Sequence, residues 1–137
     1  ISEFPKESKI ISNAREINNY KSEWCIEKIK STALQFEIEN NRKPTIDLMG
    51  LAFKPNIDDL RESPTKHIVN KFLQENSGEY FIVEPNIIEH KGYKLTDYKI
   101  ALRHADIITL LVGHKEFNNL EIESDKIVLD FCGIKNI

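Results

Sequence analysis

Four short apolar runs in the last two thirds of the chain constrain the fold more than any other feature of the sequence. They are rich in Ile, Val, Leu and Phe, do not alternate cleanly with polar residues, and cover residues 45–51, 80–83, 107–112 and 127–131. Continuous apolar runs of this length are typical of strands that are buried on both faces of a parallel sheet.

Helical segments are expected between these runs. Ser63 and Pro64 form an N-cap followed by a proline in the first turn, and the residues 76–78 end that helix. A second helix begins near residues 96–97, and a shorter one follows His114. The alternation of strand and helix predicts an α/β fold, with a Rossmann-like parallel sheet of about four to five strands and helices on both faces.

A long amphipathic helix is expected to precede this sheet, over residues 6–39. Its apolar positions recur at gaps of three or four with one gap of five: Ile10, Ala14, Ile17, Tyr20, Trp24, Ile29, Ala33 and Phe36. Such a helix would be roughly 50 Å long, so it either lies on its own domain or packs partly on something absent from this chain or on a second copy. The polar residues 40–44 end it, which divides the chain into a linking helix (1–41) and an α/β domain (42–137).

Composition excludes several classes of protein. The 19 basic and 22 acidic residues give a net charge of −3, which disfavours binding to nucleic acid. No apolar run approaches the roughly 20 residues of a membrane span. The two cysteines are too few for a disulfide framework and indicate a reducing cytoplasm. Because the chain begins with Ile1 and without a signal peptide, we expect a fragment of a longer protein.

The segment 50–64, which follows the first predicted strand, carries the strongest site signal. It contains two cations, three acidic residues and a phenylalanine, and it leads into a capped helix N-terminus that favours an anion. Lys54 and Arg61 can bind phosphate, and Phe53 can stack on a ring. In the alternative interpretation, Arg61 pairs with Asp58 or Glu62 and Lys54 is solvated. The five glycines are widely spaced and form no G-x-G-x-x-G turn.

The other strand ends carry weaker signals. Glu84 can bind a ribose or simply start a loop, and Asp130 can bind a ligand or cap backbone amides. His114 can contact a ligand or start a turn. The histidines show no zinc-binding spacing, so no metal site is predicted. Nothing local indicates that Cys25 or Cys132 is nucleophilic, and Cys25 is expected to pack as a small apolar group.

The sequence GLAFKPNIDDLRESP at residues 50–64 resembles the signature loop of the UDP-glucose/GDP-mannose dehydrogenase family. Three further stretches resemble the family in the same order, at residues 13–24, 83–87 and 105–130. The resemblance is to the C-terminal, UDP-binding domain together with the end of the central linking helix. The form of the loop is most similar to the branch that acts on UDP-N-acetyl-D-mannosamine.

This resemblance implies that the parent enzyme oxidises the C6 alcohol of a UDP-sugar to a carboxylate in two steps, with NAD as cofactor. Phe53 and Lys54 match residues that contact the UDP-sugar, and Arg61 matches an arginine that reaches toward NAD. The catalytic residues lie outside this chain, which is therefore expected to be inactive alone and to form a homo-oligomer through its long helix. Relatives often carry a basic residue where this chain has Cys132.

Two alternatives remain open at the level of the sequence. The chain can belong to a sister enzyme that oxidises UDP-N-acetylglucosamine or UDP-glucose. It can also be a non-catalytic interaction module, in which the loop forms internal ion pairs and the long helix binds a partner helix.

Overall fold

The computed structural model describes residues 5–51, 64–75, 79–88, 90 and 92–133, with side chains described from residue 21 onward. The elements follow one another along the chain in this order: α1 (Pro5–Asn40), β1 (Thr45–Met49), α2 (Pro64–Glu75), β2 (Glu79–Val83), α3 (Tyr98–His104), β3 (Ile107–Leu110), the 3₁₀ turn η1 (Lys115–Phe117) and β4 (Ile127–Asp130). Each predicted strand and helix is present at nearly its expected position. Ser63 and residues 76–78, the expected ends of α2, lie outside the described residues.

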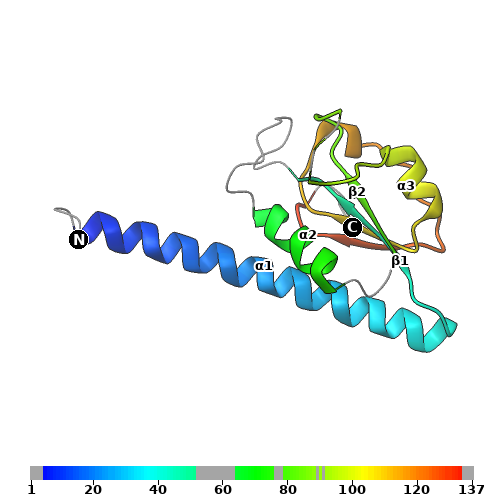
Figure 1. Ribbon diagram of the computed structural model, residues 1–137, viewed down its shortest axis with the longest axis horizontal. Helices are drawn as coiled ribbons and strands as arrows, with labels where there is room; N and C mark the ends of the chain where they lie inside the picture. The colour runs from blue at the N-terminus through cyan, green and yellow to red at the C-terminus, as the bar shows by residue number, and fades with distance from the viewer. Residues whose placement is uncertain (1–4, 52–63, 76–78, 89, 91, 134–137) are drawn as a thin grey trace.

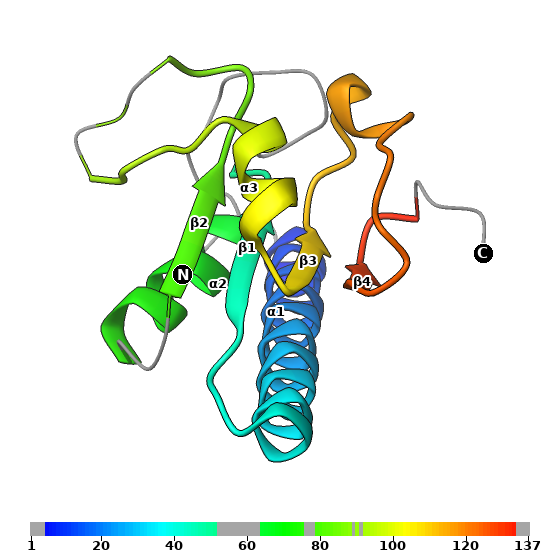
Figure 2. The same cartoon turned by 90° about the vertical axis from the view of Figure 1, so that its right-hand side faces the viewer.

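The four strands form one parallel sheet in the order β2-β1-β3-β4. Helices α1 and α2 lie together on one face of the sheet, and α3 lies on the other (Figures 1 and 2). The predicted α/β class, with helices on both faces of a parallel sheet, is therefore confirmed.

The hydrophobic core is divided by the sheet into two clusters. On the α1/α2 face, Ile46 and Leu48 of β1 pack with Ile26 and Ile29 of α1 and with residues of α2. On the α3 face, the other side of β1 contributes Met49, which packs with residues of β3 and α3. Because both faces of β1 are covered, apolar residues on each side of the strand are buried, and the polar residues within it are Thr45 and Asp47.

The predicted apolar stripe of α1 needs one correction. Ile29 and Phe36 are buried as expected, but Trp24 is 53% exposed, and the neighbouring Cys25 and Ile26 take the core positions. The Trp24 ring instead makes an edge-to-face contact with Phe131 just beyond β4. Helix α1 also extends well past the sheet toward its N-terminus (Figure 1).

A charged junction holds the end of α1 next to the start of β3. Asn41 ends the helix in the left-handed region, with φ of 55°. Arg42 then donates two hydrogen bonds of 2.9 Å to the carboxylate of Asp106, which also accepts one from the Thr45 amide.

No helix in the described part of the chain is both long enough and apolar enough to cross a membrane.

Candidate functional site

The carboxyl ends of the four strands meet at one edge of the sheet. The residues that follow them there are Gly50 after β1, Glu84 after β2, the segment 111–114 after β3 and Phe131 after β4. The crossovers from β1 to β2 and from β2 to β3 run on opposite faces, so the strand order changes direction between β1 and β3. Ligands of open α/β sheets bind in the crevice at such a point.

The three predicted ligand-binding residues, Phe53, Lys54 and Arg61, lie outside the described residues. Their roles therefore stay predictions. The structure does describe both ends of the segment that carries them. It leaves β1 at Leu51, which is fully buried, and it returns at Pro64, the first residue of α2.

Gly50 is required at the start of this segment because the backbone there approaches the end of β3. Its φ is +110°, and an added Cβ would lie 2.7 Å from the Val112 Cβ atom and 2.9 Å from the Val112 backbone nitrogen. The Gly50 amide donates a 2.8 Å hydrogen bond to the Val83 carbonyl. Glycine thus allows the chain to leave the sheet between β2 and β3.

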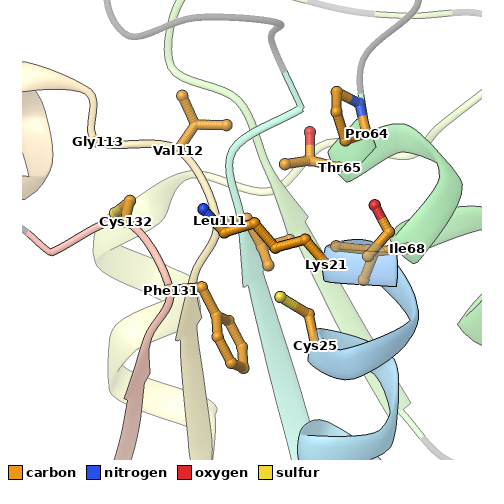
Figure 3. Close-up of a pocket in the computed structure, with 11 residues that line it drawn as sticks. Lys21, Cys25, Pro64, Thr65, Ile68, Leu111, Val112, Gly113, Phe131 and Cys132 are labelled. Carbon is orange, nitrogen blue, oxygen red and sulfur yellow. The ribbon is translucent and has the colours of Figure 1, made fainter. Parts of the chain in front are cut away.

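A pocket of about 260 Å³ lies beside this edge, on the α1/α2 face (Figure 3). Lys21 and Cys25 of α1 line one side of it, and Phe131 and Cys132 line the other. Thr65, in the first turn of α2, completes the rim. Ligand pockets commonly measure roughly 300–1,000 Å³, so this pocket has room for only part of a nucleotide sugar. Lys21 was not recognised as a site residue in the sequence.

Glu84 is buried at the edge and its carboxylate accepts hydrogen bonds from the protein on both oxygens. The Leu51 amide and His114 Nε2 bind Oε1 at 3.0 and 2.9 Å, and the Asn86 amide binds Oε2 at 3.0 Å. Burial alone would raise the pKa of Glu84, but the bonds from His114, Asn86 and Leu51 outweigh it and lower the pKa. Glu84 therefore stays ionised although its side chain is inaccessible to solvent.

Asp130, at the end of β4, follows the second of its two predicted interpretations and caps backbone amides. Its Oδ1 accepts hydrogen bonds from the amides of Cys132 and Gly133 at 3.1 and 2.8 Å, and one from the Cys132 thiol at 3.4 Å. A carboxylate beside the thiol does not favour the thiolate form that a nucleophile requires.

Cys25 packs in the core, as expected, and is 5% exposed. Burial raises the pKa of the Cys25 thiol, although the nearby charge of Lys21 opposes this effect. The thiol thus stays in its protonated, unreactive form. Among the described residues, no group of three or more His, Cys, Asp and Glu side chains could hold a metal ion.

The pairing of Glu84 with His114 was missed in the sequence, although each residue was noted at its strand end. The two are 30 residues apart, and only the order of the strands brings them together. Their shared signal was that Glu84 directly follows one apolar run and His114 lies two residues after another, and that the carboxyl ends of such runs meet at one edge of a parallel sheet.

The model of the UDP binding domain of the UDP-glucose/GDP-mannose dehydrogenase family matches residues 47–136. The chain belongs to this family. The match covers β2, β3, β4 and all but the first two residues of β1, and it includes the segment 50–64, whose resemblance to the family is thereby confirmed.

Named relatives agree with this assignment. The chain is 44% identical over 135 residues to UDP-N-acetyl-D-mannosamine dehydrogenase of Campylobacter jejuni, covering 93% of this chain and 31% of the relative. It is 37% identical over 127 residues to the enzyme of that name in Escherichia coli K12, covering 85% of this chain and 30% of the relative. It is 36% identical over 136 residues to NDP-N-acetyl-D-galactosaminuronic acid dehydrogenase of Ralstonia nicotianae, covering 95% of this chain and 31% of the relative. The chain thus spans about a third of the length of these relatives.

Solved structures of the family share the fold. UDP-N-acetyl-mannosamine dehydrogenase of Staphylococcus aureus matches with a TM-score of 0.73 and 26% identity, over 96% of this chain and 31% of that one. A UDP-glucose dehydrogenase of Pyrobaculum islandicum matches with a TM-score of 0.60 at 20% identity, over 90% of this chain and 28% of that one. This match concerns the fold alone.

Proposed function

We propose that this chain is the UDP-sugar-binding domain (residues 42–137), with its linking helix (residues 1–41), of an NAD-dependent UDP-N-acetyl-D-mannosamine 6-dehydrogenase. The observation that carries the proposal is the match of residues 47–136 to the family's UDP binding domain. The 44% identity to the Campylobacter jejuni enzyme favours the mannosamine substrate.

The geometry of the edge supports this function. The signature segment leaves the sheet where the strand order changes direction, and it ends at the N-terminus of α2, a 12-residue helix. The amides and dipole at the start of a helix favour a diphosphate. In the proposed site, Lys54 binds the diphosphate as a point charge, Phe53 packs against the UDP-sugar, and Arg61 extends toward NAD.

This chain does not carry the features expected of a principal NAD-binding site. Its five glycines form no dinucleotide-binding turn, and the described cysteines are poor nucleophiles. NAD, which accepts hydride in such oxidations, is expected to bind mainly outside this chain. The isolated chain should therefore produce no NADH when mixed with NAD⁺ and any UDP-sugar, and steady NADH production would contradict the proposal.

The test of the site uses the full-length protein that contains this chain. Lys54→Ala should raise the KM for the UDP-sugar with little change in kcat, because it removes a contact made equally in the ground state and the transition state. Lys43→Ala is the matched control, since Lys43 is exposed at the opposite, amino-terminal edge of the sheet. An unchanged KM in Lys54→Ala removes that residue from the site.

Arg61→Ala should impair the use of NAD⁺, and wild-type kinetics with NAD⁺ would contradict its role.

The sugar is assigned by a product assay with separate UDP-sugars. The Ralstonia nicotianae relative, named for an N-acetylgalactosaminuronic acid, makes a different amino sugar the specific alternative. A uronate formed from UDP-N-acetylmannosamine in preference to UDP-N-acetylglucosamine, UDP-N-acetylgalactosamine and UDP-glucose supports the proposal.

Calorimetry that detects no binding of UDP to the full-length protein would instead favour an interaction module.

We also propose a cytoplasmic homo-oligomer that assembles through α1. Both cysteines are free, which fits a reducing compartment. Helix α1 has 36 residues, about 54 Å at 1.5 Å per residue, and it carries exposed apolar side chains at Leu34 and Ile38.

A further inference from the structure

The strand ends around the signature segment are joined by a buried polar network that the proposed ligand contacts do not explain. It consists of Glu84 and Asn86 after β2, His114 after β3, and the Leu51 amide after β1. The side chains of Glu84 and His114 are both inaccessible to solvent. Burying an ion and an imidazole is costly unless their polar atoms are hydrogen-bonded, so this arrangement needs a reason.

The hydrogen bonds run in one direction through the network. Asn86 Nδ2 lies 3.0 Å from His114 Nδ1, and an amide nitrogen only donates. Nδ1 therefore accepts, and the ring proton is on Nε2, which donates to Glu84 Oε1 at 2.9 Å. The His114 ring thus links the side chain of Asn86 to the carboxylate of Glu84 through two hydrogen bonds.

The carboxylate in turn holds the first residue of the signature segment. Glu84 Oε1 accepts both the His114 bond and the Leu51 amide at 3.0 Å. Leu51 directly follows Gly50, where the chain passes within contact distance of Val112. A close backbone approach and a charge-assisted hydrogen bond therefore hold the backbone at Gly50 and Leu51, immediately before residues 52–63.

We propose that Glu84 and His114 are positioning residues for the nucleotide diphosphate of the substrate. They act through the amide of Leu51, the last described residue before the segment that carries Phe53 and Lys54. This inference rests on the proposed function, because it assumes that the segment binds the UDP-sugar. It adds two buried side chains, of which Glu84 binds the described base of this segment at the Leu51 amide.

The test compares two substitutions of His114 in the full-length protein. His114→Gln keeps an N–H donor for Glu84 and an acceptor for Asn86, whereas His114→Leu removes both at similar volume. We expect His114→Leu to raise the KM for the UDP-sugar and the calorimetric Kd for UDP by about tenfold or more, with kcat per folded molecule unchanged. His114→Gln should stay within about twofold of wild type for both constants.

A purely structural role gives a different result. It would lower thermal stability and the active fraction, and hence the apparent kcat, without changing the KM. Phe72→Leu, a core substitution in α2 remote from the network, serves as the control for destabilisation alone. An unchanged KM in folded His114→Leu, or equal KM values for the Leu and Gln variants, overturns the proposal.

Glu84→Gln keeps the test decisive if His114→Leu does not fold. The amide keeps one acceptor oxygen and the volume of Glu84, but it presents an N–H group to one of the donors that the carboxylate accepts. We expect a KM several-fold above wild type, and a wild-type KM would contradict the proposal. Failure of the wild-type protein to bind UDP instead refutes the proposed function, and with it this inference.

Discussion

Among the residues that the structure describes, Asp47 is the one whose burial is least compensated. Its side chain is inaccessible in the middle of β1, and neither carboxylate oxygen has a hydrogen-bond partner within the described part of the chain. Burial raises the pKa of Asp47 well above its ordinary value. In the folded protein, the Asp47 carboxyl group is therefore either protonated or a charge without solvation, and both states are costly.

Replacement of this acid should stabilise the protein. We expect Asp47→Val to increase the free energy of unfolding at pH 7 by about 1–3 kcal/mol, because Val suits a buried strand and removes the unsatisfied carboxyl group. Since the folded pKa is raised, the native state holds more protons than the unfolded state above about pH 4, and wild-type stability falls as pH rises through that window. The advantage of Asp47→Val, measured by urea unfolding, should therefore be larger at pH 7 than at pH 4.

Asp47→Asn provides the control for titration. It keeps the shape and a buried polar group but cannot ionise, so its own unfolding should lack this pH dependence. Equal stability of wild type and Asp47→Val at pH 7 would show that the carboxyl group is satisfied in solution.

Gly50 should tolerate no side chain. Its φ of +110° and the 2.7 Å approach of an added Cβ to Val112 combine two costs, and we expect Gly50→Ala to lose about 2 kcal/mol or more of stability. Val112→Ala, combined with Gly50→Ala, should recover little stability, because the Val112 Cβ atom and backbone nitrogen that the added methyl group would meet both remain. Thermal unfolding that leaves Gly50→Ala at the wild-type midpoint would contradict this close approach.

At the scale of elements, the Arg42–Asp106 pair joins the end of α1 to the sheet. The hydrogen bonds of the Arg42 guanidinium, aided by the Thr45 amide and opposed by partial burial, lower the pKa of Asp106. A lowered carboxyl pKa contributes stability that is present above about pH 4 and is lost as pH falls through the folded pKa.

Asp106→Asn should therefore be less stable than wild type near neutral pH, and the difference should shrink below about pH 4. Urea unfolding between pH 3 and pH 7 measures it. Glu121→Gln, at an exposed acid, is the control that should show little effect. A difference between wild type and Asp106→Asn that does not change with pH would mean that the charge of Asp106 contributes nothing.

At the scale of the whole molecule, α1 is longer than the sheet that it covers (Figure 1), and part of its apolar surface is exposed. Leu34 and Ile38, one helical turn apart, are 59% and 65% exposed. The double substitution Leu34→Gln and Ile38→Gln should weaken self-association and leave the fold intact, because the core faces of Ile29 and Phe36 are unchanged.

Analytical ultracentrifugation of the full-length protein measures this effect as a shift toward smaller species at a given concentration. Lys28→Gln, at another exposed position of α1, should leave the distribution unchanged. Self-association that is equally strong in the double variant would show that subunits contact each other elsewhere.

The sequence by itself determined the order of the elements, the parallel sheet and the family, because apolar periodicity, turn residues and the 50–64 motif are local signals. It did not determine which side of α1 meets the core at Trp24, Cys25 and Ile26, since this depends on how α1 packs against α2 and against Phe131, just beyond β4. It also could not show that Glu84, His114 and Leu51 meet. Those contacts depend on the strand order β2-β1-β3-β4, which places residues far apart in the chain at one edge, and only the tertiary structure decides that order.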